Sequence, residues 1–319
     1  MKTIGVLTSG GDAPGMNAAI RAVVRSANYH GIEVYGIKRG FRGLLEKNYE
    51  VLDSRSVSDI LQKGGTFLKT ARCPEFNTPE GVIKARDIIN DLGLDALVVI
   101  GGDGSIRGGA ELAKQGIKVI ALPGSIDNDM GYTDYTIGFD TAITTVMHAV
   151  SNLRDTSSSH GRVFVVQVMG RECGDIALHA GIICGAEEVI VPEVPFDLKE
   201  LSANMKRSMA RGKDHYIILL AEGAADPFEF TEELKELSGL NTRLNIIGYL
   251  QRGGSPSSFD RMLATRMGVY AIDLLMEGVE NVAVGIKGND IVHEELYKAV
   301  EVRDSLDRDL YEIAKILAV

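Results

Sequence analysis

The stretch Val98-Val99-Ile100-Gly101-Gly102-Asp103-Gly104-Ser105 decides the fold of this chain. Its apolar beginning predicts a β-strand over 96–100, and the residues after it predict a helix over 105–114. Glycines at such a turn let phosphate oxygens approach the backbone amides, and the helix N-terminus favours negative charge. Asp103 would repel a phosphate unless it holds Mg²⁺ there. The alternative is a tight turn in which Asp103 only caps the helix, and this segment alone leaves both open.

The same order of apolar run, Gly-rich turn and amphipathic stretch extends outward from this segment over the whole sequence. It predicts strands and helices that alternate along the chain. Because the strands are apolar on both faces, the pattern favours an α/β fold with parallel sheets covered on two sides. The expected strands are 4–7, 33–37, 96–100, 119–122, 163–168, 188–191, 216–221 and 245–248, and the expected helices are 17–28, 79–92, 105–114, 141–154, 176–183, 198–211 and 259–277.

Length and composition exclude several classes of protein. A chain of 319 residues is expected to form about two domains. Its net charge of −10 makes it a poor general nucleic-acid binder, so any anion must be bound by local Arg and Lys clusters. No apolar run approaches the ~20 residues of a bilayer span, and no signal peptide is expected. The three cysteines have no metal-type spacing, which favours a cytoplasmic protein with reduced thiols.

The first Gly-rich turn, residues 8–17, also lies between an expected strand and an expected helix. It lacks the dinucleotide spacing G-x-G-x-x-G and the phosphate loop G-x-x-x-x-G-K-[ST]. Both an NAD(P)-dependent oxidoreductase and an ordinary NTPase are therefore disfavoured.

Two carboxylates follow the expected strand 119–122, in the loop Pro123-Gly124-Ser125-Ile126-Asp127-Asn128-Asp129. One of them could accept a hydroxyl proton while the other orients it or lies near a metal. The alternative is an Asx-rich surface turn.

Two arginines follow expected strands beside glycines. Met169-Gly170-Arg171 comes after 163–168, and Gln251-Arg252-Gly253-Gly254 comes after 245–248. An arginine in such a place can reach a transferring phosphoryl group, although a surface arginine is the alternative for each segment taken alone.

Together these segments resemble the bacterial ATP-dependent 6-phosphofructokinases. The resemblance rests on 7–21, 64–72, 98–105, 123–129, 169–171, 221–223 and 251–256, and it covers essentially the whole chain. It implies a glycolytic enzyme that transfers the γ-phosphoryl of MgATP to the 1-hydroxyl of fructose 6-phosphate. It also implies two domains, each a mostly parallel sheet flanked by helices. Residues 1–138 plus 252–304 would bind ATP, and residues 139–251 plus 305–319 would bind the sugar phosphate.

The resemblance further implies a role for each motif residue. Asp103 would hold Mg²⁺, Asp127 would accept the proton, and Arg171 would offset charge on the transferring group. The implied ATP contacts are Gly11, Arg72, Cys73, Gly102, Asp103, Gly104 and Ser105. The implied sugar-phosphate contacts are Ser125, Ile126, Asp127, Arg162, Met169, Gly170, Arg171, Glu222, Arg243, Tyr249, Leu250, Gln251 and Arg252.

A homotetramer and an effector site are implied as well. Arg162 and Arg243 would reach the sugar phosphate of a neighbouring subunit, so each active site would be completed across an interface. ADP would activate and phosphoenolpyruvate would inhibit at a site between subunits. The implied effector residues are Arg21, Ala22, Val23, Val24, Arg25, Arg154, Gly185, Ala186, Glu187, Arg211, Lys213, Asp214 and His215.

Two positions bear on the identity of the phosphoryl donor, and two others depart from the pattern of the family. Related pyrophosphate-dependent enzymes typically carry Asp and Lys where this chain has Gly104 and Gly124, so the expected phosphoryl donor is ATP. A non-catalytic nucleotide sensor remains a third possibility, but it should have lost Asp103, Asp127 or Arg171. Well-known members have Arg where Ser54 stands and commonly His where Tyr249 stands, which puts effector strength and sugar-phosphate affinity in doubt.

Overall fold

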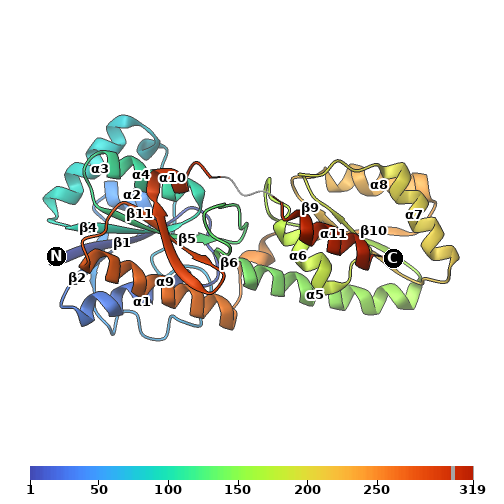
Figure 1. Ribbon diagram of the computed structural model, residues 1–319, viewed down its shortest axis with the longest axis horizontal. Helices are drawn as coiled ribbons and strands as arrows, with labels where there is room; N and C mark the ends of the chain where they lie inside the picture. Colours follow the sequence, from blue (N-terminus) through green and yellow to red (C-terminus); the bar gives the residue numbers. More distant parts are fainter. Residues whose placement is uncertain (303–305, 319) are drawn as a thin grey trace. The chain divides into compact units, whose positions relative to one another are not determined.

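The computed structural model describes residues 1–302 and 306–318, with the side chains of 158–160 left aside. They form two compact units, Met1–Thr141 with Arg252–Asp304 and Ala142–Gln251 with Ser305–Val319. Each unit is a mostly parallel sheet flanked by helices (Figure 1), which confirms the predicted fold class. The expected second crossing, between 304 and 305, falls outside the described residues.

Unit 1 contains an eight-stranded sheet in the order β12-β11-β5-β4-β1-β2-β3, with β6 beside β5. The inner strands are parallel and fully buried because helices cover both faces. The two edges are antiparallel pairs, β2 with β3 and β11 with β12, which the sequence pattern did not predict. The strands are β1 (Thr3–Ser9), β2 (Glu33–Ile37), β3 (Tyr49–Leu52), β4 (Ala96–Gly101), β5 (Val119–Ser125), β6 (Ile137–Gly138), β11 (Val282–Lys287) and β12 (Asp290–Glu295).

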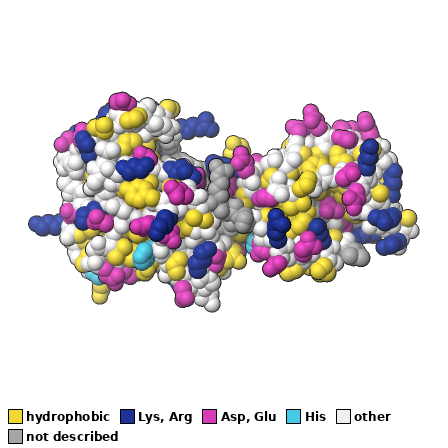
Figure 2. Space-filling model, turned by 45° about the horizontal axis from the view of Figure 1, so that its top comes forward, with side chains coloured by type: hydrophobic (Ala, Val, Ile, Leu, Met, Phe, Trp, Pro, Cys, Tyr) yellow, Lys and Arg dark blue, Asp and Glu magenta, His cyan; other side chains and the backbone are white. Residues whose placement is uncertain are grey.

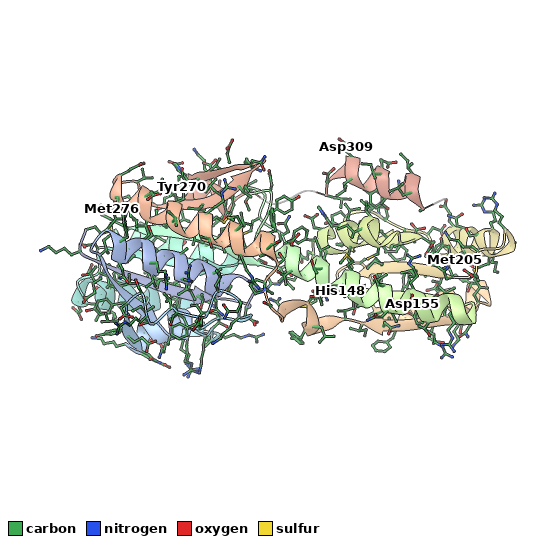
Figure 3. All side chains as sticks on the ribbon, turned by 90° about the horizontal axis from the view of Figure 1, so that it is seen from below. His148, Asp155, Met205, Tyr270, Met276 and Asp309 are labelled. Carbon is green, nitrogen blue, oxygen red and sulfur yellow. The ribbon has the colours of Figure 1, made fainter. Side chains whose placement is uncertain are left out.

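Two groups of helices cover the sheet of unit 1 (Figure 1). Helices α1 (Met16–Tyr29) and α9 (Ser258–Met276) pack together on one face. The two helices approach closely at Gly268, where an added Cβ would lie only 2.6 Å from the Cβ of Ala22. Tyr270, labelled on α9 in Figure 3, also shares a 2.9 Å hydrogen bond with His293 of the edge strand β12. The other face is covered by α2 (Gly40–Leu45), η1 (Pro74–Asn77), α3 (Pro79–Asp91), α4 (Asp103–Lys114) and α10 (Leu296–Ala299).

Asp260 forms hydrogen bonds that hold the segment through which the chain leaves unit 1. Its fully buried carboxylate accepts hydrogen bonds from the amides of Gly138 and Thr141, each at 2.8 Å. The Thr141 hydroxyl accepts a further bond from the Ser257 amide, close to where the chain re-enters the unit. Burial raises the pKa of Asp260 to about 6.

Unit 2 contains a four-stranded parallel sheet in the order β10-β7-β9-β8. On one face, Met205 of α7 (labelled in Figure 3) and Phe230 of α8 pack against apolar strand residues. The opposite face carries α5 (Phe139–His160), α6 (Asp175–Cys184) and α11 (Arg308–Leu317) (Figure 1). The remaining elements are β7 (Val163–Val168), β8 (Glu188–Ile190), α7 (Leu198–Ala210), β9 (Tyr216–Ala221), α8 (Pro227–Ser238), β10 (Thr242–Ile246) and the 3₁₀ helix η2 (Gly248–Arg252).

The prediction of a strand over 245–248 was wrong in its bounds. Strand β10 spans Thr242–Ile246, so Tyr249 lies in η2 and does not follow the strand directly. The strand is at the edge of its sheet and only half-buried, with Arg243 exposed. The polar residues at the start of this strand gave no apolar signal. The apolar pair Ile246-Ile247 therefore shifted the predicted strand toward the C-terminus. Among the described residues, none of the helices is both long and apolar enough to cross a bilayer.

Glu188 makes the stability of unit 2 depend on pH. Burial, and next to it the charge of Glu200, raise the Glu188 pKa to about 7, while Lys315 opposes the shift. The folded unit therefore binds a proton that the unfolded chain releases near pH 4.5, and stability falls as pH rises from about 4.5 to 7. Glu188→Gln should remove this loss. We expect the variant to exceed the wild type by up to about 3 kcal/mol at pH 8 and by little at pH 4.5.

Urea unfolding followed at both pH values measures this difference. The matched control is Glu236→Gln, which removes an exposed carboxylate from α8 of the same unit. An advantage of the Glu188→Gln variant that is the same at both pH values would contradict the prediction.

Candidate active site

The Gly-rich turns of unit 1 meet at one edge of its sheet. Strands β1, β4 and β5 are parallel neighbours, with Ser9 opposite Gly101 and Gly101 opposite Pro123. All three turns therefore leave the sheet at its carboxyl edge, where open α/β sheets bind ligands. The backbone is crowded there, because a Cβ at Gly101 would overlap the Ser9 carbonyl oxygen and lie 2.6 Å from the Ser105 hydroxyl oxygen.

Asp103 is the first residue of α4 and not its cap. Gly102 occupies the N-cap position and has an extended backbone, so the capping alternative is wrong. The Asp103 carboxylate accepts from Nε of Arg107, one turn later, at 2.9 and 3.1 Å. Arg107 in turn donates to the Val300 carbonyl at 2.5 Å. Sequence analysis missed Arg107, although its i, i+4 spacing from Asp103 is a recognisable signal for such a pair.

The surroundings of Asp103 fit a magnesium nucleotide. The carboxylate is 40% exposed, and a Cβ at Gly104 would meet nothing within 4 Å, so space is open over the first turn of α4. Within the described ranges, no three His, Cys, Asp or Glu side chains could form a metal cage. Mg²⁺ commonly takes one or two protein carboxylates and completes its shell with water and substrate phosphates. One accessible carboxylate beside an open helix N-terminus suits that mode.

Arg252 lies against the first Gly-rich turn. Its Nη1 donates to the Asp12 carbonyl at 3.3 Å, and a Cβ at Gly11 would overlap the guanidinium. Arg72 is exposed, and Cys73 is half-buried at the start of η1. These side chains belong to unit 1, so Arg252 is in the same unit as the implied nucleotide contacts.

Asp127 is held in a buried, closely bonded loop. The side chain is 2% exposed, and the Asp127 amide donates to the Ser125 hydroxyl at 3.2 Å. Thr136 fixes the loop from the other side, because its hydroxyl donates to the Ser125 carbonyl at 2.7 Å and its amide donates to the Asn128 side chain at 2.9 Å. The surface-turn alternative is therefore wrong. Ile126 is fully buried, so its side chain belongs to the core.

In unit 2, three turns at the strand ends are bonded together. The Arg171 amide donates to the Glu222 carboxylate at 2.8 Å, and the Met169 amide donates to the Gln251 side chain at 3.2 Å. Arg171 has a left-handed backbone with φ of 54°, which leaves its side chain exposed. Gly223 has no room for a Cβ, which would overlap the Arg171 carbonyl oxygen. The structure thus brings 169–171, 222 and 251 together as the sequence implied.

The remaining sugar-phosphate candidates of unit 2 lie at its surface or half-buried. Arg162 stands just before β7, and its Nε is buried without a hydrogen-bond partner among the described residues. Arg243 is exposed on the neighbouring strand β10. Tyr249 and Leu250 are 82% and 72% exposed.

A second cluster of charges in unit 2 contains several implied effector residues. The Glu187 carboxylate is buried, accepts from the Ile217 amide at 2.6 Å and lies 3.1 Å from the Lys213 ammonium. Arg154 bonds to His215 at 2.8 Å and donates to the carbonyls of Cys184 and Gly185. Arg211, Asp214 and Ala186 lie beside these residues in sequence, at the ends of α7 and α6.

The unit 1 part of the effector set lines a pocket between α1 and α9. The pocket holds about 400 Å³, and Arg21, Ala22 and Arg25 contribute to its wall. Arg25 also donates to the Ser54 carbonyl at 3.3 Å. Val23 and Val24 are fully buried in the core, so their side chains cannot contact an effector. Figure 2 shows acidic and basic side chains interspersed over the face in view, so local clusters of this kind must supply the anion contacts there.

Comparison with known proteins identifies the family. Residues 3–275 match the family model described as phosphofructokinase. The chain belongs to the phosphofructokinase family. Curated relatives named ATP-dependent 6-phosphofructokinase include that of Clostridium acetobutylicum, which is 54% identical, and that of Alkaliphilus metalliredigens, which is 52% identical. Each match covers 100% of both chains.

Solved phosphofructokinases share the architecture. The Saccharomyces cerevisiae enzyme is 36% identical with a TM-score of 0.88 over 100% of this chain, which spans about half (48%) of the yeast chain. A pyrophosphate-dependent phosphofructokinase from Marinobacter aquaeolei is 20% identical with a TM-score of 0.84, over 97% of this chain and 86% of that one. At that identity the likeness shows the fold alone and carries no argument about the phosphoryl donor.

Proposed function

We propose that this chain is an ATP-dependent 6-phosphofructokinase that converts fructose 6-phosphate into fructose 1,6-bisphosphate. The observation that carries the proposal is the identity of 52–54% with bacterial enzymes of that name over the full length of both chains. The geometry of unit 1 supports it, because Asp103 and Asp127 each lie two residues after the ends of the neighbouring strands β4 and β5, at the carboxyl edge of one sheet.

The donor pocket favours a nucleotide over pyrophosphate. Gly104 leaves open space above α4, where the bulk of a nucleotide needs room. At Gly124 a Cβ would lie 2.9 Å from the Met16 methyl carbon, so a lysine that could pair with pyrophosphate does not fit without displacement. We therefore take ATP as the donor.

The reaction needs positioning and charge neutralisation more than covalent help from the protein. Bound Mg²⁺, held by Asp103, would neutralise charge on the nucleotide phosphates. Asp127 accepts the proton of the sugar 1-hydroxyl as its oxygen attacks the γ-phosphorus and the bond to ADP breaks. Arg171, fixed by the Glu222 carboxylate, offsets charge on the transferring group. Arg252 binds the sugar phosphate, and Arg162 and Arg243 reach the sugar phosphate of a neighbouring subunit.

Release of ADP is the decisive measurement. Purified protein, MgATP and fructose 6-phosphate are combined with a coupled ADP assay, and pyrophosphate replaces ATP in a parallel reaction. We expect turnover with ATP alone. Turnover with pyrophosphate alone would show a pyrophosphate-dependent enzyme, and no turnover with either would favour a nucleotide sensor.

We further propose a cytoplasmic homotetramer, activated by ADP and inhibited by phosphoenolpyruvate. The charged clusters around Glu187 and around Arg21 and Arg25 support an anionic effector, since each offers cationic groups that phosphate prefers. Sedimentation of the purified protein tests the assembly.

Ser54→Arg should strengthen inhibition by phosphoenolpyruvate. Ser54 is exposed and its carbonyl already contacts Arg25, so an arginine there adds a guanidinium beside the effector cluster. A charge-assisted hydrogen bond contributes about 1.5–3 kcal/mol. We expect half-inhibition at roughly tenfold lower phosphoenolpyruvate, measured by titration at fixed fructose 6-phosphate. The control Ser58→Arg adds the same charge four residues on, at another exposed position. Equal inhibition of both variants and the wild type would contradict the expected contact.

A further inference from the structure

Tyr132 carries a buried hydroxyl that core packing does not explain. The side chain is 7% exposed, and its hydroxyl oxygen has no hydrogen-bond partner in the part of the chain that the structure describes. Leaving such a group unsatisfied costs about 1–3 kcal/mol. Phenylalanine would fill the same space among the apolar side chains of unit 1 without that cost. A hydrogen-bond acceptor outside the apolar core would satisfy this hydroxyl.

The Tyr132 ring lies at the edge of the sheet where the candidate active site is built. A Cβ at Gly285 would be 3.3 Å from the ring, which therefore packs against the backbone of β11. Strand β11 runs parallel beside β5, and its register continued by two residues puts Gly285 level with Pro123. Pro123 pairs with Gly101 at the end of β4, two residues before Asp103. Tyr132 and Asp103 thus belong to the same carboxyl edge.

The loop that carries Tyr132 is fixed to β11. The Ile286 amide donates to the Thr133 hydroxyl at 2.9 Å, and the Asp134 amide donates to the Ile286 carbonyl at 2.9 Å. The Asp134 carboxylate also accepts from the Gly288 amide at 2.7 Å. With the backbone held on both sides and the ring buried, the hydroxyl keeps one position relative to α4.

Tyr132 belongs to the same apolar cluster as Ile106 and Ala110 of α4, the helix that begins at Asp103. Its phenol is a neutral hydrogen-bond donor at pH 7. Both Asp103 oxygens now accept from Arg107. A carboxylate has about four lone-pair sites, so metal binding at one oxygen leaves acceptor capacity for a hydroxyl donor.

We propose that Tyr132 is a positioning residue of the metal–nucleotide site, whose hydroxyl donates a hydrogen bond to the Asp103 carboxylate when that carboxylate turns from Arg107 toward bound Mg²⁺. The inference rests on the proposed function, because it takes Asp103 as the magnesium ligand. Such outer partners fix the orientation of a ligating carboxylate, and losing one typically lowers metal affinity about 10–100-fold. Tyr132 should therefore affect binding of the magnesium complex and not binding of the nucleotide itself.

Tyr132→Phe tests this by equilibrium binding, independently of turnover. Calorimetry with a non-hydrolysable ATP analogue is done with Mg²⁺ and with a chelator. We expect the variant to bind the magnesium complex about tenfold more weakly and the metal-free analogue as the wild type does. Because an unsatisfied hydroxyl is removed, its unfolding midpoint should be equal or higher. Adding Tyr132→Phe to Asp103→Ala should cause no further loss, since the acceptor of the hydroxyl is already removed.

The matched control is Tyr135→Phe, from the same loop, whose ring packs against Phe259 with 5.1 Å between ring centroids. It should bind both forms of the analogue normally. The proposal is overturned by a Tyr132→Phe variant that binds both forms like the wild type, or that weakens both equally. A wild type that binds both forms equally overturns it too. A wild type that prefers the magnesium complex but does not phosphorylate fructose 6-phosphate refutes the proposed function alone.

Discussion

Asp127→Asn is expected to lower kcat by about 10²–10⁴ while affinity for MgATP changes little, since the substitution keeps the shape and removes the proton acceptor. The effect should fall on the chemical step because the hydroxyls of Ser125 and Thr136 hold the loop through its backbone, at the Asp127 amide and the Ser125 carbonyl. Steady-state kinetics with saturating fructose 6-phosphate, together with nucleotide binding, measure the two quantities. Asp127→Ser, which removes both shape and base, should be at least as impaired.

The control for this substitution is Asp134→Asn in the same loop. Asp134 forms an ion pair with Lys287 at 2.9 Å on the β11 side of the loop. It should lose some stability but keep most of its kcat. If the Asp127→Asn variant retained most of its kcat, Asp127 would not be the base.

Gly223→Ala is expected to lower kcat by about 100-fold without unfolding unit 2. An added Cβ would overlap the Arg171 carbonyl oxygen, so the turn that carries Arg171 must shift away. Displacing a catalytic group by about 1 Å can cost about 10²-fold in rate. Kinetics and urea unfolding are measured on the same preparation to separate the two effects.

Gly239→Ala supplies a matched loss of stability. Gly239 ends α8 in unit 2 with φ of 70° and open space around it, so alanine there is strained but touches nothing near Arg171. It should lose stability and keep its kcat. Loss of activity in both variants to the same degree would attribute the Gly223→Ala effect to stability instead of to Arg171.

The parallel core and its turns could be predicted from sequence because their signals are local. Strands β7 and β9 were predicted at their observed bounds, since β9 is a continuous apolar run and Gln167 is the one polar residue of β7. The edge elements were missed for the opposite reason. Strand β3 has only four residues, two of them exposed, and β12 is largely polar. Antiparallel pairing with a neighbour places both strands, and no local sequence pattern records such pairing.

In the candidate site, too, some residues could be predicted from sequence and others could not. The glycines and aspartates of 98–105 and 123–129 can be recognised from their residue type and from their position after a predicted strand. The unsatisfied hydroxyl of Tyr132 cannot be recognised in this way, because it depends on side-chain packing that only the folded chain defines. Val23 and Val24 entered the effector set through a motif, and the structure adds that their side chains are buried in the core.

The nested order of the two units has a consequence for biosynthesis. Residues Ala142–Gln251 form one continuous stretch, so most of unit 2 is complete before the ribosome has made α9 or β11. Until then β5 lacks β11, its neighbour on one side, and the face of α1 that α9 will cover is exposed to water. Pairings so distant in sequence form late and slowly. The nascent N-terminal half is therefore the form of this protein with the greatest need of a chaperone.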